Sequence, residues 1–283
     1  MATAASLLSN IRKIFGDPDS DFISDAVGLD WLDRAQRRFC NKVLPLDEIK
    51  DYTITAKVNK FDLPTATILP VWLMWYKSST RKLDYVPPST WADQEEAWPN
   101  ATGTPENYTV LRRQVVVGPQ VPQTASSNST ASGAITSTGT TLGLVAASGT
   151  FRSKGYVKIN SEIIEYTGVA TTTLTGAVRG VHGTTAASHA SADTVTQIDL
   201  QMLYRKSPAA LATGNSPDIP DTYHEYLEKY ALYLAWLARG DSQKAGAALQ
   251  EFEQLEQDSL RQTGRRALDN ALLIQDRKNR VRW

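Results

Sequence analysis

A long stretch without charge is the feature that most constrains how this chain folds. No charged residue occurs from Gln114 through Phe151, although charged residues make up 21% of the 283-residue sequence. The stretch consists mostly of serine, threonine, alanine, glycine and small apolar residues. Its composition differs from that of the segments on either side, which indicates a part of the chain that folds separately from the rest.

The segment that follows predicts short β-strands. The runs GYVKI, EIIEYTG and TTLTGAV are rich in β-branched residues and are separated by turn-forming residues. They predict a three-stranded meander, followed by a loop and by a last strand at Thr194. We therefore predict that residues 122–196 form an inserted small all-β domain. Such an insertion costs the host little, because each doubling of a loop's length costs only about 0.6 kcal/mol.

Helical periodicity marks the two ends of the chain. Apolar residues recur at helical spacing in residues 6–15 and 24–43, and again in residues 218–239 and 242–256. Ser24 or Asp25 can cap the second helix. Gly240 suits the end of the third helix, and the turn directly after it predicts that the last two helices form an antiparallel pair.

Runs of β-branched and alternating residues predict host strands at residues 52–58, 66–77, 108–117 and 197–204. The segment Pro87–Pro105 is rich in proline and tryptophan and is typical of a surface loop. These patterns predict an α+β fold: an antiparallel helical bundle with a small antiparallel β element, plus the inserted all-β module. The expected domains are a helical/β core of residues 1–121 and 197–264, the inserted domain of residues 122–196, and a C-terminal arm of residues 265–283.

Bulk properties exclude several classes of protein. Lysine plus arginine equals aspartate plus glutamate at 30 each, which argues against a surface-wide electrostatic grip on nucleic acid. Cys40 is the single cysteine, so no disulfide forms within the chain, and its place in an apolar helical pattern indicates a buried thiol. No apolar run approaches the roughly 20 residues that span a bilayer. The N-terminus lacks the order of a signal peptide, so we expect a soluble protein made in a cytoplasm, with no membrane partner.

Two glutamates three residues apart, Glu162 and Glu165, are the strongest candidates for catalysis. Paired carboxylates about 5–10 Å apart define glycoside hydrolysis. Positions three apart on a strand, however, point to opposite faces of a sheet. We therefore expect no catalytic role, and we expect Glu162→Gln to leave assembly and infectivity near normal.

The histidines raise the question of a metal site. His182, His189 and Asp193 stand at spacings of seven and four, which match no standard zinc pattern. Hydrogen bonds that hold a turn are the expected role of these histidines, and packing or a salt bridge is the expected role of Arg179. No phosphate-loop, GxSxG or HExxH motif occurs. The sequence thus predicts a protein that is not an enzyme, without catalytic residues, metal or cofactor.

The C-terminal segment GRRALDNALLIQDRKNRVRW combines an apolar cluster with basic residues. It could contact nucleic acid by stacking of its last tryptophan, extend as a solvated helix, or dock on a partner protein. We favour docking, because the apolar cluster would otherwise lie in water. The residues expected to dock are Leu272, Leu273, Ile274, Arg277, Arg280 and Trp283.

The order of these pieces resembles a known family. GDPDSDFISD leads to a helix with AQRRF, and GTPENY, GPQVP, YRKSP and IPDTYHEYLEKYALYLAWLARGDSQKAGAALQEFEQ follow. Over residues 5–120 and 198–265 this resembles the head-to-tail adaptor proteins of tailed bacteriophages, also called connector or head-completion proteins. The segment GYVKINSEIIEYTG with TLTGAVRGVHGTTAASHASADTV is similar to a small β-module found in phage structural proteins.

The resemblance implies a structural virion protein that works without a cofactor. It implies a homo-oligomeric ring, a dodecamer, that binds the portal protein, presents a platform to tail or nozzle proteins, and contacts passing DNA transiently. The protein would be assembled in the host cytoplasm and reside at the head–tail interface, and the C-terminal arm would dock on the portal. Two alternatives remain: a carbohydrate-binding or host-recognition virion protein of the tail-fibre or baseplate type, and a wall-degrading enzyme that uses Glu162 and Glu165.

Overall fold

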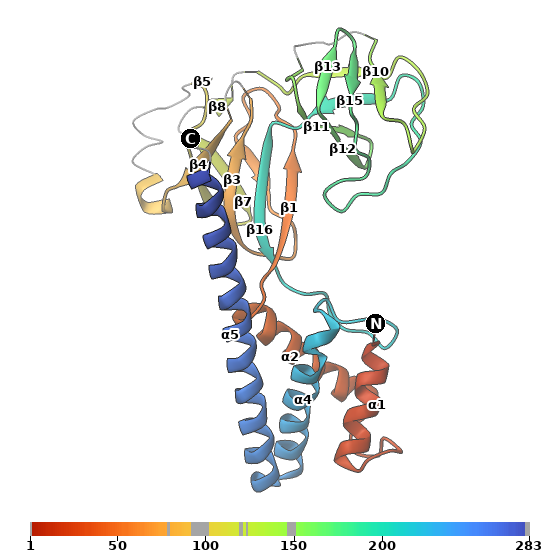
Figure 1. The fold of residues 1–283 in the computed structure, drawn as a ribbon, viewed down its shortest axis with the longest axis vertical. Helices are drawn as coiled ribbons and strands as arrows, with labels where there is room; N and C mark the ends of the chain where they lie inside the picture. Colours follow the sequence, from red (N-terminus) through yellow and green to blue (C-terminus); the bar gives the residue numbers. More distant parts are fainter. Residues whose placement is uncertain are drawn as a thin grey trace. The chain divides into compact units, whose positions relative to one another are not determined.

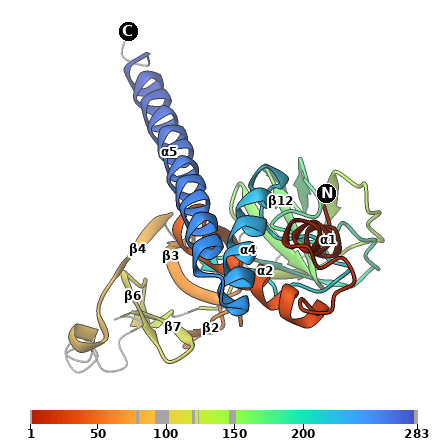
Figure 2. The same cartoon turned by 90° about the horizontal axis from the view of Figure 1, so that it is seen from below.

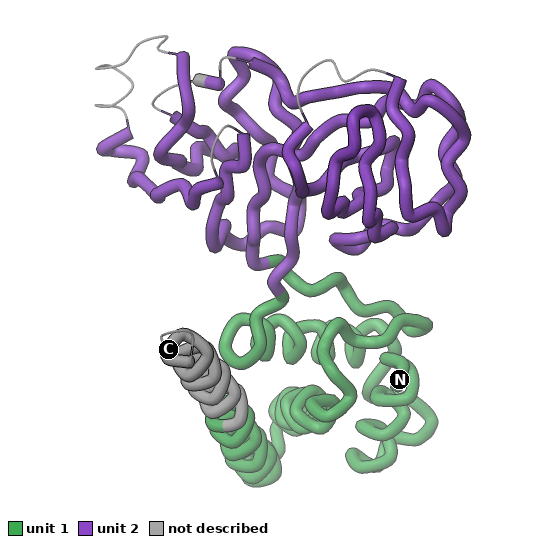
Figure 3. The backbone as a smooth tube through the Cα atoms, turned by 45° about the horizontal axis from the view of Figure 1, so that its top comes forward, with its two compact units in different colours: residues 1–46, 206–283 green, residues 47–205 purple. Residues whose placement is uncertain are grey.

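The computed structural model describes residues 2–77, 80–91, 102–118, 121–122, 124–145 and 151–280 (Figure 1). The chain forms two compact units (Figure 3). Unit 1 combines Met1–Leu46 with Lys206–Trp283, and unit 2 comprises Asp47–Arg205. Unit 2 is thus inserted in sequence between the two pieces of unit 1.

Unit 1 is helical. Its helices are α1 (Ala4–Phe15), α2 (Asp25–Lys42), α4 (His224–Arg239) and α5 (Ser242–Arg280), with a short 3₁₀ helix at Asp221–Tyr223. Helix α4 packs against α1, α2 and α5 (Figure 2). The buried core includes Leu8, Leu32, Phe39, Leu227 and Phe252. The antiparallel pair predicted from the spacing of apolar residues is the α4–α5 pair.

The ends of these helices follow the capping residues that the sequence contains. The Ser24 hydroxyl accepts a hydrogen bond from the Val27 N–H at 3.4 Å, which caps α2. Gly240 adopts a left-handed conformation with φ of 83° and ends α4. The Asp241 carboxylate accepts from the Lys244 N–H at 3.0 Å and caps α5. These caps confirm the predicted turn between the last two helices.

Unit 2 is built of β-sheets. Its largest sheet has seven strands in the order β1, β16, β3, β4, β6, β7, β2. Their bounds are β1 Leu46–Tyr52, β2 Lys60–Asp62, β3 Thr67–Trp75, β4 Arg81–Tyr85, β6 Asn107–Leu111, β7 Gln114–Gly118 and β16 Leu200–Lys206. Strands β4 and β6 are parallel, whereas β3 and β4 are antiparallel. Leu73, Trp75, Leu83, Val115 and Met202 lie in the core of this sheet.

Smaller sheets complete unit 2. A four-stranded sheet has the order β12, β11, β15, β9, a three-stranded sheet has the order β10, β14, β13, and β5 pairs with β8. The bounds are β5 Thr102–Gly103, β8 Val121–Pro122, β9 Asn128–Thr130, β10 Thr141–Gly143, β11 Gly155–Ile159, β12 Glu162–Tyr166, β13 Gly168–Ala170, β14 Thr173–Thr175 and β15 Thr194–Gln197. The predicted hairpin of the first two runs is the β11–β12 pair. The third run forms strand β14, which pairs with β10 and β13. Its last residue, Val178, pairs antiparallel with Glu165 of β12, so the third run does return along the second, but the predicted meander is divided between two sheets.

The predicted fold class was wrong as a whole. The structure is mainly β, and its dominant element is the seven-stranded sheet rather than a helical bundle with a small β element. Three strands of this sheet were not predicted. Strands β2 and β4 lie outside the predicted strands, and β1 overlaps one of them by a single residue. Strands β1 (LDEIKDY) and β4 (RKLDY) are rich in charge, and β2 has only three residues. Apart from Tyr85, their exposed positions carry charged side chains, so these strands show little of the apolar alternation by which a strand is predicted.

The inserted all-β domain stays a prediction. Residues between Ala131 and Val195 form a hydrophobic cluster of their own, which includes Leu142, Ile164 and Leu174. These residues nevertheless belong to the same compact unit as the seven-stranded sheet. A separate core is what an inserted module requires.

Candidate functional site

The carboxylate of Glu162 on β12 lies at the centre of a group of hydrogen bonds in unit 2. Its side chain is fully buried. Arg179 donates to it through Nε at 2.8 Å and through Nη2 at 2.7 Å, and His189 Nε2 lies 2.6 Å from Oε2. The N–H groups of Gly180 and Ala187 donate at 3.0 and 3.1 Å. We call these five residues the Glu162 cluster; it fastens strand β12 to the loop that follows β14.

These contacts determine the protonation of Glu162. Burial alone would raise the pKa of this carboxyl, but hydrogen bonds from Arg179, from the Ala187 N–H and from His189 outweigh it and lower the pKa to about 2. The group is therefore ionised at neutral pH and cannot donate a proton to a substrate. Its geometry is that of a structural anchor, and the ion pair confirms the salt bridge predicted for Arg179.

A second buried carboxylate organises unit 1. Glu256 on α5 accepts from Arg38 Nε at 3.0 Å and Nη2 at 3.1 Å, from Lys42 Nζ at 3.3 Å and from the Tyr226 hydroxyl at 2.9 Å. The Arg38 guanidinium also lies 4.8 Å from the centre of the Phe252 ring. This Glu256 cluster joins α2, α4 and α5. Although burial acts to raise the pKa of Glu256, these hydrogen bonds lower it to about 2.

We expect both units to lose stability in acid. A carboxyl whose pKa falls from 4.5 unfolded to about 2 folded stabilises the native state fully above pH 4.5. That contribution, on the order of 3 kcal/mol for each cluster, is lost as the pH falls from about 5 towards 2. Urea unfolding at pH 7, 5 and 3 measures it. An unchanged free energy of unfolding between pH 7 and pH 3 would contradict both clusters.

Glu165 lies apart from this cluster, as the strand geometry predicts. It is half-buried, pairs across the hairpin with Tyr156, and lines a pocket instead of entering the core. The two glutamates therefore do not converge on one bond. The arrangement therefore does not support the hypothesis of a wall-degrading enzyme, which needs these two carboxylates on either side of one bond.

The histidines contact carboxylates. His182 Nδ1 lies 2.6 Å from Asp51 of β1, and its ring lies 4.6 Å from the Tyr156 ring. Gln201 of β16 donates to the other oxygen of Asp51 at 2.6 Å. His189 is buried against Glu162, with its Nδ1 3.8 Å from Asp193. In the part of the chain that the structure describes, no group of three histidine, cysteine or acidic side chains is arranged to hold a metal.

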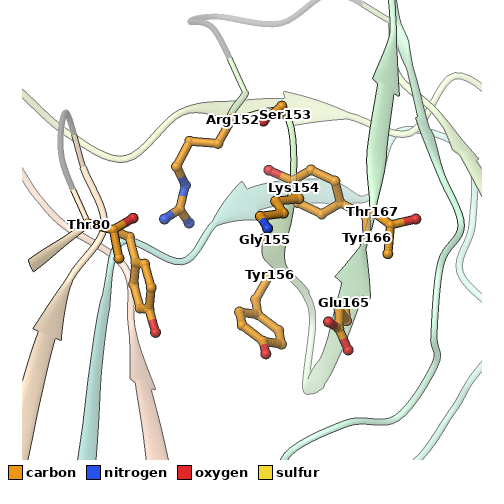
Figure 4. A pocket seen from close by; sticks show the side chains of 10 residues that line it. Thr80, Arg152, Ser153, Lys154, Gly155, Tyr156, Glu165, Tyr166 and Thr167 are labelled. Atoms are coloured by element: carbon orange, nitrogen blue, oxygen red, sulfur yellow. The ribbon is translucent and has the colours of Figure 1, made fainter. Parts of the chain in front are cut away.

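A pocket of about 580 Å³ opens beside the β11–β12 hairpin, and Figure 4 shows its lining side chains. Arg152, whose guanidinium lies 4.9 Å from the Tyr76 ring, forms one wall. Tyr156 and Tyr166 contribute two further rings, and burial raises the pKa of Tyr166 to about 12. Protonated phenols and aromatic faces can hold a small polar ligand such as a sugar.

A second groove, of about 560 Å³, lies at the start of β3. Ile68, Leu69 and Val71 of β3 are exposed there, together with Tyr85 at the end of β4. Exposed apolar side chains gathered in this way are typical of surfaces that contact a partner. Sequence reasoning missed it, because ATILPVWLMWYK reads as a strand without showing which face is covered.

The predicted docking residues lie on one helix as far as the structure describes them. The backbone of α5 runs without a break from Ser242 through Gly264 to Arg280. Leu272, Leu273, Ile274, Arg277 and Arg280 are therefore on its last turns, and Trp283 lies outside the described residues. Their role in docking stays a prediction. Cys40 is buried as predicted, and burial raises the pKa of its thiol to about 11.

None of the described helices combines the length and apolar character needed to cross a membrane.

Comparison with known proteins identifies the family to which the chain belongs. A search of curated proteins found no match. The sequence model of the SU10 adaptor proteins, a phage head–tail adaptor family, matches residues 2–278 and so spans both units. The chain therefore belongs to the SU10 adaptor protein family and is a structural adaptor of a phage particle.

Proposed function

We propose that this protein forms a ring, a dodecamer, that joins the portal to the tail and lets DNA pass through its centre. The observation that carries the proposal is the family match over residues 2–278, which includes the helices of unit 1 and the sheets of unit 2. The partners are the portal protein on one side and tail or nozzle proteins on the other. Assembly takes place in the host cytoplasm, and the ring stays at the head–tail interface of the virion.

The charge of the chain supports this role. Equal numbers of acidic and basic residues give no net charge. Because phosphate contacts dominate protein–DNA affinity, a balanced subunit suits a channel in which DNA slides with transient contacts. Affinity for the neighbouring rings then comes from weak contacts that recur at every subunit. The separate core of residues 131–195 supports an inserted module at residues 122–196, carried by the ring as an accessory part.

We propose that the C-terminal arm docks on the portal through Leu272, Leu273 and Ile274, with Arg277, Arg280 and Trp283 at its rim. A chain that ends at Gly264 is expected to fold normally, since Leu260 is the last described side chain that packs on the core of unit 1. It is expected to lose portal binding, by more than about 100-fold, because apolar anchors carry most of the energy of an interface.

The test is electron microscopy and cosedimentation of purified chain with purified portal. Full-length chain is expected to form rings on the portal, and the chain ending at Gly264 is expected to remain unbound with an unchanged circular dichroism spectrum. A variant with both Arg277→Ala and Arg280→Ala keeps the apolar residues of the arm and should weaken portal binding less than the truncation does. Unaltered binding of the truncated chain would disprove the docking role of the arm, and a full-length chain that never forms rings on the portal would disprove the ring.

The pocket beside Tyr156 favours one alternative function, a carbohydrate-binding or host-recognition virion protein. Its rings and its charged groups Arg152, Lys154 and Glu165 match what sugar hydroxyls require. A glycan array separates the two functions. Binding that is lost in Tyr156→Ala and kept in the chain ending at Gly264 would favour the alternative.

A further inference from the structure

The apolar groove at the start of β3 exists because strand β4 is short. Leu73 of β3 lies opposite Leu83 of β4, so this register places Tyr85, the last residue of β4, opposite Val71. Residues 67–70 of β3 extend past this point. With β4 ended, the first part of β3 and the last part of β6 face each other across an open space, which we call the β3–β6 groove.

The groove has an apolar floor and a basic end. Ile68 is 46% exposed, Leu69 43% and Tyr85 54%. The charged residues that line it are Arg112 and Arg113, both exposed, in the turn between β6 and β7. Arg113 donates to the carbonyls of residues 64 and 65, at 3.3 and 2.9 Å, which holds its guanidinium at the edge of the groove. The surface thus fits an occupant that is apolar and acidic.

The chain itself carries a segment of that chemistry. Residues 16–24, between α1 and α2, contain three aspartates and no basic residue. In this acidic loop Asp19 and Asp21 are exposed, and Phe22 is 44% exposed although large and apolar. An exposed aromatic ring flanked by acidic side chains is the complement of an apolar floor flanked by two arginines.

The acidic loop is held in shape without a partner. The buried Asp17 carboxylate accepts from the N–H groups of Phe22 at 3.2 Å and of Ile23 at 2.7 Å. The Phe22 ring stacks on Phe15 at 5.4 Å, and Arg12 donates to the Ile23 carbonyl at 2.9 Å. Because the loop is already ordered, little conformational entropy is lost when it binds.

We propose that the acidic loop of one copy binds the β3–β6 groove of a second copy. Phe22 enters the apolar floor between Leu69 and Tyr85, and Asp19 and Asp21 face Arg112 and Arg113. Each chain offers one loop and one groove, so the contact is heterologous, and heterologous contacts that close on themselves generate rings. The inference rests on the proposed ring and names the surfaces that form it.

Charge reversal in two variants tests the contact. One variant carries Asp19→Lys with Asp21→Lys, and the other carries Arg112→Glu with Arg113→Glu. Each alone sets like charges against each other at every contact and is expected to reduce ring assembly on the portal by at least about tenfold. An equal mixture of the two variants restores opposite charges at every contact of an alternating ring. Assembly should then return to within about threefold of wild type.

The controls make each result decisive. Lys57→Glu with Lys158→Glu reverses two exposed charges elsewhere in unit 2, outside both pockets, and should assemble as wild type. Normal assembly of both reversal variants would disprove the contact and leave the proposed ring standing. Loss that mixing does not rescue would also overturn it, since the loop would then bind within its own chain or to another protein. Wild-type chain that forms no rings would instead disprove the proposed function.

Discussion

Replacing Glu162 with glutamine is expected to lower the free energy of unfolding of unit 2 by about 3–5 kcal/mol. Glutamine brings no charge to Arg179, whose side chain is only 7% exposed, and leaves that guanidinium buried without its counter-ion. His189 loses the same partner. Urea unfolding measures the change, and faster amide hydrogen exchange in residues 155–166 locates it.

Glu165→Gln is the matched control for this prediction. It makes the same chemical change three residues along the same strand, but its carboxylate lies in the pocket wall outside the Glu162 cluster. We expect it to change stability by less than about 0.5 kcal/mol. Equal losses in the two variants would mean that the cluster is not what stabilises β12. The sequence alone predicts tolerance of Glu162→Gln, because it does not show that Arg179 is buried against this residue.

Glu256→Gln is expected to have a comparable effect on unit 1, about 3–5 kcal/mol. The carboxylate receives Arg38 and Lys42 from α2 and the Tyr226 hydroxyl from α4, so its neutralisation weakens the attachment of α5 to both helices at once. Thermal unfolding followed by far-ultraviolet circular dichroism at pH 7 reports this loss, because unit 1 is the helical part of the chain.

The control for unit 1 is Glu253→Gln. Glu253 lies one turn earlier on α5 and is exposed, so its replacement should leave the melting temperature nearly unchanged. The two variants differ only in which carboxylate is removed. A melting temperature that fell equally in both would show that helix α5 is weakened by any loss of charge, and would contradict a specific role of the Glu256 cluster.

The helical unit could be predicted from the sequence because its signals are local. Apolar side chains at three-and-four spacing, Ser24 before α2 and Gly240 after α4 each act within one or two turns. The sequence also contains a signal of the Glu256 cluster, because Glu256 falls on the apolar side of its helix. Its partners Arg38 and Lys42 lie more than 200 residues earlier in the chain, and no local pattern connects them.

The sheet could not be predicted in the same way. Strand β4 forms by pairing with β3 on one side and β6 on the other, and its own sequence, RKLDY, carries three charges. Charged side chains are compatible with a strand when they point to solvent, but periodicity analysis reads them as loop. The boundary of unit 2 was hidden for a similar reason, because it begins inside β1, whose residues alternate only weakly. Likewise, the Glu162 cluster depends on turns that bring Arg179, Ala187 and His189 back to one point.

The insertion of unit 2 within unit 1 determines the order in which a ribosome can complete the two. All of residues 47–205 are synthesised before α4 and α5 exist, whereas α1 and α2 have no complete core until those helices emerge. Leu8, Leu32 and Phe39 are buried in the finished protein and face water during that interval. The nascent N-terminal helices are therefore the part of the chain that most needs a chaperone. If translation stops within unit 2, their apolar side chains stay exposed and the product is prone to aggregate.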